Sequence, residues 1–197
     1  MSLISGRVEA LDTETTGMSP ATGHALVEVA RVRVENGAVA DHWSSLVNPG
    51  RPIPADAAAV HGITDAMVAN APTAATVAPV LRDGCGEATL VLHNAPFDLP
   101  FLSALLRAAG VRPLWNPVVD TLGLSRGLFG SGSNSLGALA GRFSLPAETA
   151  HRALGDALTT ARLFVLLAER WEREKGIRSL AELAAVSQDV VRVNGRR

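Results

Sequence analysis

The alternation of apolar and polar residues at the start of the chain predicts β-strands. Residues 8–14 read as one strand, and residues 25–34, with the sequence ALVEVARVRV, read as a second. In the second strand the apolar phase changes between Val29 and Ala30, which indicates a β-bulge. The pair Asn36-Gly37 is typical of a two-residue hairpin turn. Residues 38–47 are therefore predicted to form a third strand in an antiparallel meander.

The rest of the chain predicts helices that alternate with short strands. A Pro-rich loop with a short Ala-rich helix covers residues 48–64, and GSGSNSLG at 130–137 is predicted to be a flexible loop. Helices are predicted at 73–83, from 97 onward, at 151–174 and at 178–186, and short strands at 88–92 and 118–119. This order predicts an α/β fold: a mixed five-stranded sheet, with three antiparallel strands and then parallel α/β units, and helices on both faces.

Length and composition are those of one ordinary domain. The chain has 197 residues, of which 47% are hydrophobic and 19% charged, so it is not a disordered chain. We expect a main domain at 1–175, followed by a C-terminal helix and tail at 176–197. The last residues, DVVRVNGRR, are interpreted as a disordered terminus rather than as a tail that binds a partner.

Charge and cysteine content narrow the function classes. The net charge of −1 argues against a broad basic surface for long duplex nucleic acid. The single cysteine, Cys85, allows neither an internal disulfide nor a cysteine-based zinc site. The start lacks the pattern of a signal peptide, and no apolar run is long enough to cross a bilayer. We expect a soluble cytoplasmic protein that does not bind membranes.

The stretch ALDTETTG places two acids on a predicted core strand. Asp12 and Glu14 are two positions apart, so their side chains point to the same face. Two ionised carboxylates at this distance repel each other unless a cation lies between them. The alternative is a pair of solvated acids at an exposed strand end. Gly17, which follows, permits a close backbone approach.

Two further clusters of polar residues precede or begin predicted helices. In VLHNAPFD, Asp98 falls in the first turn of a helix, where an acid is also common for structural reasons. In HRALGDA, His151 and Asp156 would point about 140° apart on a continuous helix. They can share a site only if His151 belongs to the loop or first turn; otherwise His151 is an exposed or capping residue. Gly155 in the same helix indicates a packing or access requirement.

Taken in order, DTETTG, VHGIT (60–64), HNAPFD and HRALGDA resemble the motifs of the DEDDh, or DnaQ-like, family of 3′→5′ exonucleases. This family includes the proofreading epsilon subunit of bacterial DNA polymerase III. The resemblance extends to LVNPGRPIP (46–54), APT (71–73) and VVDTLGLSR (118–126), and covers about residues 8–170. It implies a ribonuclease H-like fold, in agreement with the strand and helix pattern.

The resemblance also implies a catalytic site with two divalent ions, Mg²⁺ or Mn²⁺. The metal-binding acids would be Asp12, Glu14, Asp98 and Asp156, with Asp12 bridging both ions and Asp98 acting largely through water. His151 would be the general base that takes a proton from the attacking water. Mg²⁺ prefers oxygen ligands, and two ions can stabilise both the attacking and the leaving oxygen of a phosphodiester.

Residues that contact the substrate are implied by the same resemblance. They are Thr15, Thr16, Gly17, Met18, Asp56, Val60, His61, Asn94 and Phe97. The backbone at 15–17 would meet the 3′-terminal nucleotide, and Met18 and Val60 would be apolar wedges against bases. For Met18, Val60 and Phe97, simple membership of the core is an equal alternative.

Three functions follow as hypotheses. The first is a DNA 3′→5′ exonuclease that releases 5′-mononucleotides from single-stranded or frayed ends, as a proofreader bound to a polymerase subunit through the C-terminal tail, or alone. The second is an exoribonuclease that trims RNA 3′ ends or short oligoribonucleotides, with discrimination at the 2′-OH. The third is a non-catalytic polymerase adaptor, against which the complete set of five site residues argues.

Overall fold

The computed structural model describes the backbone of residues 3–194 and the side chains of residues 3–188. Five strands form one mixed sheet in the order β3-β2-β1-β4-β5. The strands are β1 (Arg7–Thr15), β2 (Leu26–Glu35), β3 (Ala38–Leu46), β4 (Thr89–Leu92) and β5 (Val118–Asp120). β1, β2 and β3 pair antiparallel, whereas β4 pairs parallel with both β1 and β5. The predicted fold class and sheet are confirmed.

The predicted hairpin turn is present, but the bulge lies elsewhere than expected. Asn36 and Gly37 both have positive φ, 52° and 76°, and join β2 to β3. In β2 the register shifts where Glu14 faces Glu28 and Thr15 faces Leu26, so Val27 is the extra residue. The phase change at Val29–Ala30 has another cause, because β2 is buried on both faces. The position predicted for the bulge was therefore wrong.

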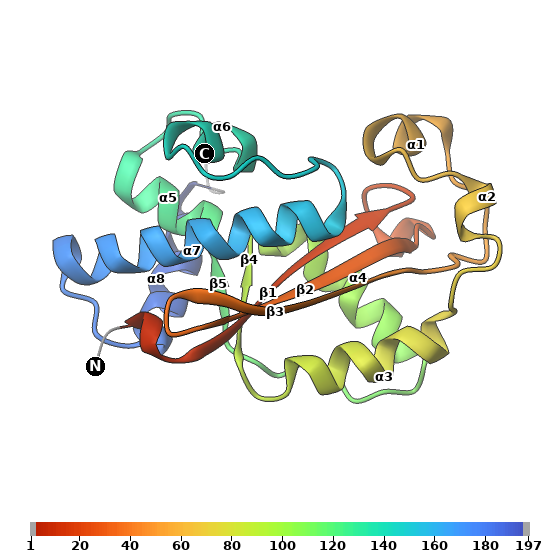
Figure 1. The fold of residues 1–197 in the computed structure, drawn as a ribbon, viewed down its shortest axis with the longest axis horizontal. Coiled ribbons are helices and arrows are strands. Elements are labelled where there is room, and N and C mark those ends of the chain that lie inside the picture. The colour runs from red at the N-terminus through yellow and green to blue at the C-terminus, as the bar shows by residue number, and fades with distance from the viewer. Residues whose placement is uncertain (1–2, 195–197) are drawn as a thin grey trace.

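Helices cover both faces of the sheet (Figure 1). The α-helices are α1 (Ala55–His61), α2 (Asp65–Val68), α3 (Ala74–Cys85), α4 (Ala95–Ala108), α5 (Thr121–Phe129), α6 (Leu136–Arg142), α7 (Ala153–Lys175) and α8 (Leu180–Asn194). Short 3₁₀ turns cover Leu3–Ser5 and Pro20–Thr22. No helix in the described part of the chain is long and apolar enough to cross a membrane.

The alternation of side chains divides the core into two layers. Ala10, Ala30 and Val32 face α7 and belong to a cluster that also contains side chains of α5, α6 and α8. Leu11 and Val29 face the other side and pack with α3 and α4. Successive residues of a strand point to opposite faces, so β1 and β2 supply both layers.

The C-terminal helix packs against the rest of the fold. α8 contacts α5 and β5, and the Ser187 side chain is fully buried. The backbone N–H of Asp120 donates to Ser187 Oγ at 3.1 Å. Residues 189–194 of the predicted tail continue α8, and residues 195–197 lie outside the described residues. The division at 175/176 remains a proposal.

Candidate active site

The C-terminal end of β1 carries the first two acids. Asp12 and Glu14 are half-buried and alternate with the buried Leu11, Thr13 and Thr15. Both therefore point to the α7 face of the sheet, as the two-residue spacing predicted.

The first turn of α7 brings a third acid to this pair. One carboxylate oxygen each from Asp12, Glu14 and Asp156 lie within 4.8 Å of one another. Asp156 also accepts a hydrogen bond from the backbone N–H of His151, at 3.0 Å. The residue before Asp156 is Gly155, and only glycine fits there, because a Cβ would lie 2.1 Å from the carbonyl oxygen of Thr149. The expected packing requirement at Gly155 is therefore present.

An ion pair with a buried carboxylate fixes the start of α7 on the sheet. Glu28 of β2 faces Glu14 across the β1–β2 pair and is 4% exposed. Its carboxylate accepts hydrogen bonds from Arg152 Nη2 at 2.7 Å, from Arg152 Nε at 3.0 Å and from the backbone N–H of Ala153 at 2.9 Å. Arg152 is the N-cap residue of α7. Glu28 thus takes the place of a side-chain cap.

The fourth acid approaches from the other side of the sheet edge. Asp98 lies in the first turn of α4 and is 4% exposed. Its Oδ1 accepts a hydrogen bond of 2.7 Å from Thr13 Oγ1. It is not among the three acids whose oxygens converge, although its charge raises the pKa of Asp12.

The electrostatics of the site favour protonated acids in the absence of a cation. Burial raises the pKa of Asp12 well above its usual range, and the charges of Asp98, Asp156 and Glu14 raise it further. Burial and the charge of Asp156 raise the pKa of Glu14 to about 8. Burial also raises the pKa of Asp98 to about 7. It raises the pKa of Asp156 above its usual value as well.

These four acids fit a divalent metal site. All their donor atoms are carboxylate oxygens, which Mg²⁺ and Mn²⁺ prefer. Among the described residues, no ion pair involves Asp12, Glu14, Asp98 or Asp156. A bound cation would offset the repulsion that raises their pKa values.

His151 belongs to the turn before α7, as a shared site with Asp156 requires. Its φ is 56°, and its side chain is exposed. The two residues line one cavity of about 600 Å³ together with side chains of α6. His151 therefore faces the space next to Asp156.

The TTG segment after β1 is held by its own hydrogen bonds. Thr15 Oγ1 donates to the carbonyl oxygen of Gly17 at 2.7 Å. Thr16 Oγ1 lies 3.2 Å from His24 Nδ1 and accepts the backbone N–H of Ala25 at 3.0 Å. A Cβ on Gly17 would lie 2.4 Å from the His24 ring. The close approach predicted at Gly17 is thus made by His24.

The structure excludes membership of the core for two of the apolar residues predicted to contact bases. Met18 is 78% exposed and Val60 is 58% exposed, so neither belongs to the core. Phe97 is half-buried and packs on Phe101, with ring centroids 5.6 Å apart. Phe97 is therefore in part a core residue.

The other predicted contact residues differ in exposure. Asp56 is exposed in α1, whereas His61 is 5% exposed and accepts the backbone N–H of Ile63 on its Nδ1. Asn94 is exposed, with a left-handed φ of 69°. Its backbone N–H donates to Asp120 Oδ1 at 2.9 Å.

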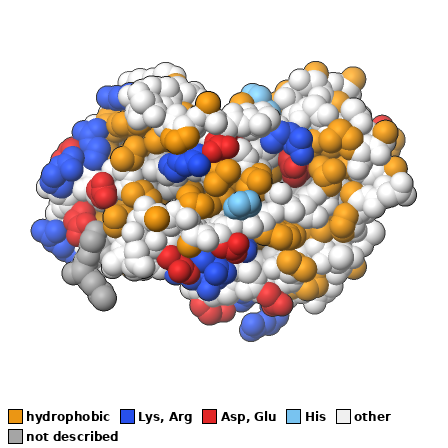
Figure 2. Space-filling model, in the orientation of Figure 1, with side chains coloured by type: hydrophobic (Ala, Val, Ile, Leu, Met, Phe, Trp, Pro, Cys, Tyr) orange, Lys and Arg blue, Asp and Glu red, His pale blue; other side chains and the backbone are white. Residues whose placement is uncertain are grey.

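A notch in the surface lies between the lobe of α6 and the lobe of α1 (Figure 2). On the face shown, Lys and Arg side chains are interspersed with acids and form no broad basic patch. This agrees with the net charge of −1.

Sequence reasoning missed the residues that hold the acids in place. They are Thr13, Glu28, Arg152 and Asp120, together with His24 beneath the TTG segment. A signal existed only for Asp120, which caps α5 directly after a short strand. Glu28 is an acid in a strand that is otherwise largely apolar, but its partner is 124 positions away in the sequence.

Comparison with known proteins identifies the same architecture. The family model described as "Exonuclease" (RNase_T) matches residues 10–164. A "DNA polymerase III subunit epsilon-like protein" of Rhodobacter capsulatus is 47% identical over 161 residues, which cover 79% of this chain and 23% of that protein. The "DNA polymerase III subunit epsilon" of Rickettsia prowazekii is 35% identical over 164 residues, or 80% of this chain and 72% of that protein.

A solved structure agrees with these sequence matches. Exonuclease X, in complex with 5′ overhanging duplex DNA, superposes with a TM-score of 0.72 and 31% identity, over 91% of this chain and 99% of that one. The resemblance drawn from the four motifs is thereby confirmed. The chain spans less than a quarter of the Rhodobacter capsulatus protein that it matches.

Proposed function

We propose, because this chain belongs to the exonuclease family, that it is a divalent-metal-dependent 3′→5′ exonuclease that releases 5′-mononucleotides from DNA 3′ ends. The observation that carries the proposal is the convergence of Asp12, Glu14 and Asp156 within 4.8 Å, with Asp98 beside them. A cluster of half-buried carboxylates without a paired cation is costly unless metal ions bind to it.

Two ions, Mg²⁺ or Mn²⁺, would be held by Asp12, Glu14 and Asp156, with Asp98 acting through water. When bound, the ions would lower the pKa of the attacking water and neutralise charge on the phosphodiester oxygens. Glu28 and Arg152 keep Asp156 and His151 at this place.

His151 would act as the general base. Its exposed ring can take a proton from the water whose oxygen forms the new bond to phosphorus. The bond from phosphorus to the 3′-oxygen then breaks, and that oxygen takes up a proton. The products are a 5′-mononucleotide and a strand one nucleotide shorter, with a free 3′-OH.

The TTG segment and the exposed apolar residues would bind the departing nucleotide. Met18 and Val60 expose enough apolar surface to contact a base. Val60 lies in α1, and Met18 lies in the loop after β1.

The metal-dependent mechanism is tested with an oligonucleotide labelled at its 5′ end. We expect stepwise shortening with Mg²⁺ or Mn²⁺, none in excess chelator, and none with Asp12→Ala. Asp83→Ala, which removes an exposed acid of α3, serves as the control and should keep full activity. Degradation by Asp12→Ala at the normal rate would refute the mechanism.

The role of His151 has its own test. His151→Ala should lose roughly 10²–10⁴-fold in rate, as expected for the loss of a general base. Its affinity for the metal should stay close to that of the wild type. His42→Ala, which removes an exposed histidine of β3, is the matched control. Normal turnover by His151→Ala would remove it from this role.

A side-by-side assay on single-stranded DNA, mismatched duplex DNA and RNA tests the choice of substrate. A preference for DNA, and for frayed over matched ends, supports the proposal. A preference for RNA would support the exoribonuclease, and inactivity on all three with metal present would support the adaptor. Binding to a polymerase through the C-terminal tail remains a prediction; both relatives described above are named after DNA polymerase III subunit epsilon.

A further inference from the structure

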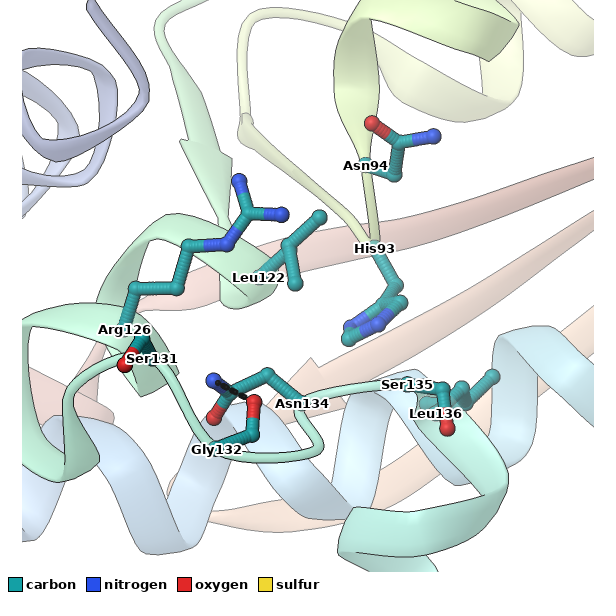
Figure 3. Close-up of a pocket in the computed structure, with 9 residues that line it drawn as sticks. All are labelled: His93, Asn94, Leu122, Arg126, Ser131, Gly132, Asn134, Ser135 and Leu136. Atoms are coloured by element: carbon teal, nitrogen blue, oxygen red, sulfur yellow. Dashed lines mark hydrogen bonds between the residues drawn. The ribbon is translucent and has the colours of Figure 1, made fainter. Parts of the chain in front are cut away.

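A second cavity adjoins the one that contains His151 and Asp156. It has a volume of about 610 Å³ and lies between the end of β4, α5 and the loop that leads into α6 (Figure 3). Ser135 and Leu136 line both cavities, so the two lie on neighbouring parts of the surface. We refer to this second cavity as the α5 pocket.

The α5 pocket is lined by both polar and apolar side chains and contains a cation without a partner. Among its described lining residues Arg126 of α5 is the one Lys or Arg, and none is an acid. The Arg126 side chain makes no ion pair or hydrogen bond with any described residue. Arg126 and His93 stand on different sides of the pocket (Figure 3). A guanidinium with free donors at the wall of a pocket suits an anionic oxygen ligand.

The wall opposite Arg126 is preformed. His93 Nδ1 lies 2.9 Å from Thr121 Oγ1, which fixes its ring. Asn134 is 6% exposed, and its Nδ2 donates to the carbonyl oxygens of Gly130 at 2.9 Å and Gly132 at 2.8 Å. Its Oδ1 is buried without a hydrogen-bond partner. The pocket thus has hydrogen-bonded polar groups of His93 and Asn134 in its wall, together with an unpaired cation.

The α5 pocket is separate from the residues expected to hold the 3′-terminal nucleotide. The residues expected to hold the 3′-terminal nucleotide include Val60 and His61 of α1. The pocket is instead lined by residues of α5 and of the loop that leads into α6, and these two helices lie at the opposite side of the molecule from α1 (Figure 1). No aromatic side chain other than His93 lines it, so stacking of bases is a poor match. A phosphate group of the nucleic-acid strand matches the lining of the pocket better than a base does.

We propose that the α5 pocket binds the sugar-phosphate backbone on the 5′ side of the bond to be cleaved, with Arg126 paired to a phosphate. This inference rests on the proposed exonuclease function. It identifies the substrate as a strand several nucleotides long and adds a binding subsite beyond the terminal nucleotide. Asn94 lies at the rim of the same pocket.

The test compares the variant Arg126→Ala on a dinucleotide and on a single-stranded DNA of ten nucleotides. On the ten-nucleotide strand we expect KM to rise about ten-fold or more, as for the loss of a charge-assisted hydrogen bond. The loss on the dinucleotide should be at least several-fold smaller, because that substrate does not reach the pocket. Arg126→Lys should recover part of the affinity, since it keeps the charge.

Two controls separate this effect from general causes. Arg107→Ala removes an exposed arginine of α4 and changes the net charge equally, and should behave like the wild type on both substrates. The dependence of log affinity on log salt concentration should fall by about 0.7 for Arg126→Ala, as for one phosphate contact on a single strand. An equal loss on both substrates, or no loss on either, would overturn the inference.

The proposed function and the inference fail in different ways. If the wild type degrades neither substrate, the function fails. The inference is then decided by fluorescence anisotropy with the labelled ten-nucleotide strand, where Arg126→Ala should bind about ten-fold more weakly than the wild type. Equal binding by the two proteins would overturn the inference alone.

Discussion

The carboxyl groups around Asp12 lie too close together to be ionised without a compensating charge. The pKa of Glu14 is raised to about 8, and that of Asp12 is raised as well, by burial and by neighbouring carboxylates. A group whose pKa is higher in the folded protein stabilises it fully below its unfolded pKa, which is about 4 for a carboxyl group. That contribution is lost as the pH rises through the folded pKa. The metal-free protein should therefore lose stability between about pH 4 and about pH 8.

Replacing Asp12 by Asn removes one of these charges and should stabilise the metal-free protein. At pH 8 in chelator, we expect the Tm of Asp12→Asn to exceed that of the wild type by roughly 2–4 °C for each kcal/mol gained in the free energy of unfolding. At pH 5 the difference should shrink, because the wild-type acids are then largely protonated. Circular dichroism melts measure both values, with Asp83→Asn as a surface control. A lower Tm for Asp12→Asn at pH 8 would contradict the electrostatic account.

At the residue scale, the sequence reveals the acids of the site better than it reveals the residues that hold them in place. The shared face of Asp12 and Glu14 follows from strand geometry alone. The positions of Asp98 and Asp156 next to this pair depend on tertiary packing. Only the family resemblance predicted that these two acids belong to the site. Exposure decided the reading of Met18, since an apolar residue in a loop can be core or surface. Thr13 carries no pattern in the sequence that marks it as the donor to Asp98.

At the scale of elements, one ion pair joins β2 to the start of α7. Glu28 accepts three hydrogen bonds from Arg152 and Ala153. His151 directly precedes these two residues, and Asp156 follows them within the first turn of α7. Glu28→Gln removes the charge and weakens these bonds. We expect a loss of about 2 kcal/mol in the free energy of unfolding and a lower kcat, because His151 and Asp156 at the start of α7 would both move.

A buried pair at the other end of the same strands gives the control. Glu9 of β1 is fully buried and pairs with Arg31 at 2.7 Å. Glu9→Gln should lower stability as well, but leave kcat unchanged at temperatures well below the Tm. Urea unfolding and single-strand degradation assays provide the two measurements. If both variants lose kcat equally, the effect of Glu28 is a general loss of stability rather than local positioning.

At the scale of the whole molecule, the order of motifs along the chain predicted the fold. The packing of the elements against one another was known only from the structure. The meander and the later α/β units follow from apolar periodicity, so the five-stranded sheet was predictable. The bulge is at Val27, and its predicted position was wrong. Because β2 is buried on both faces, it lacks the alternation of apolar and polar residues that would mark a bulge. The packing of α8 was not predictable, because it depends on a contact with α5 more than fifty positions away.

α8 connects the C-terminal part of the described chain to the site through Asp120. Ser187 Oγ accepts the backbone N–H of Asp120, and the Asp120 carboxylate accepts the N–H of Asn94, which precedes the helix of Asp98. A Cβ on Gly123 would lie 1.8 Å from the Ser187 carbonyl oxygen, so Gly123→Ala must displace α8. We expect a loss of about 1–3 kcal/mol, measured by thermal melts, and faster cleavage by trypsin between α7 and α8. Gly137→Ala, with open space around it, should be neutral or stabilising. A wild-type Tm for Gly123→Ala would show that α8 does not pack as described.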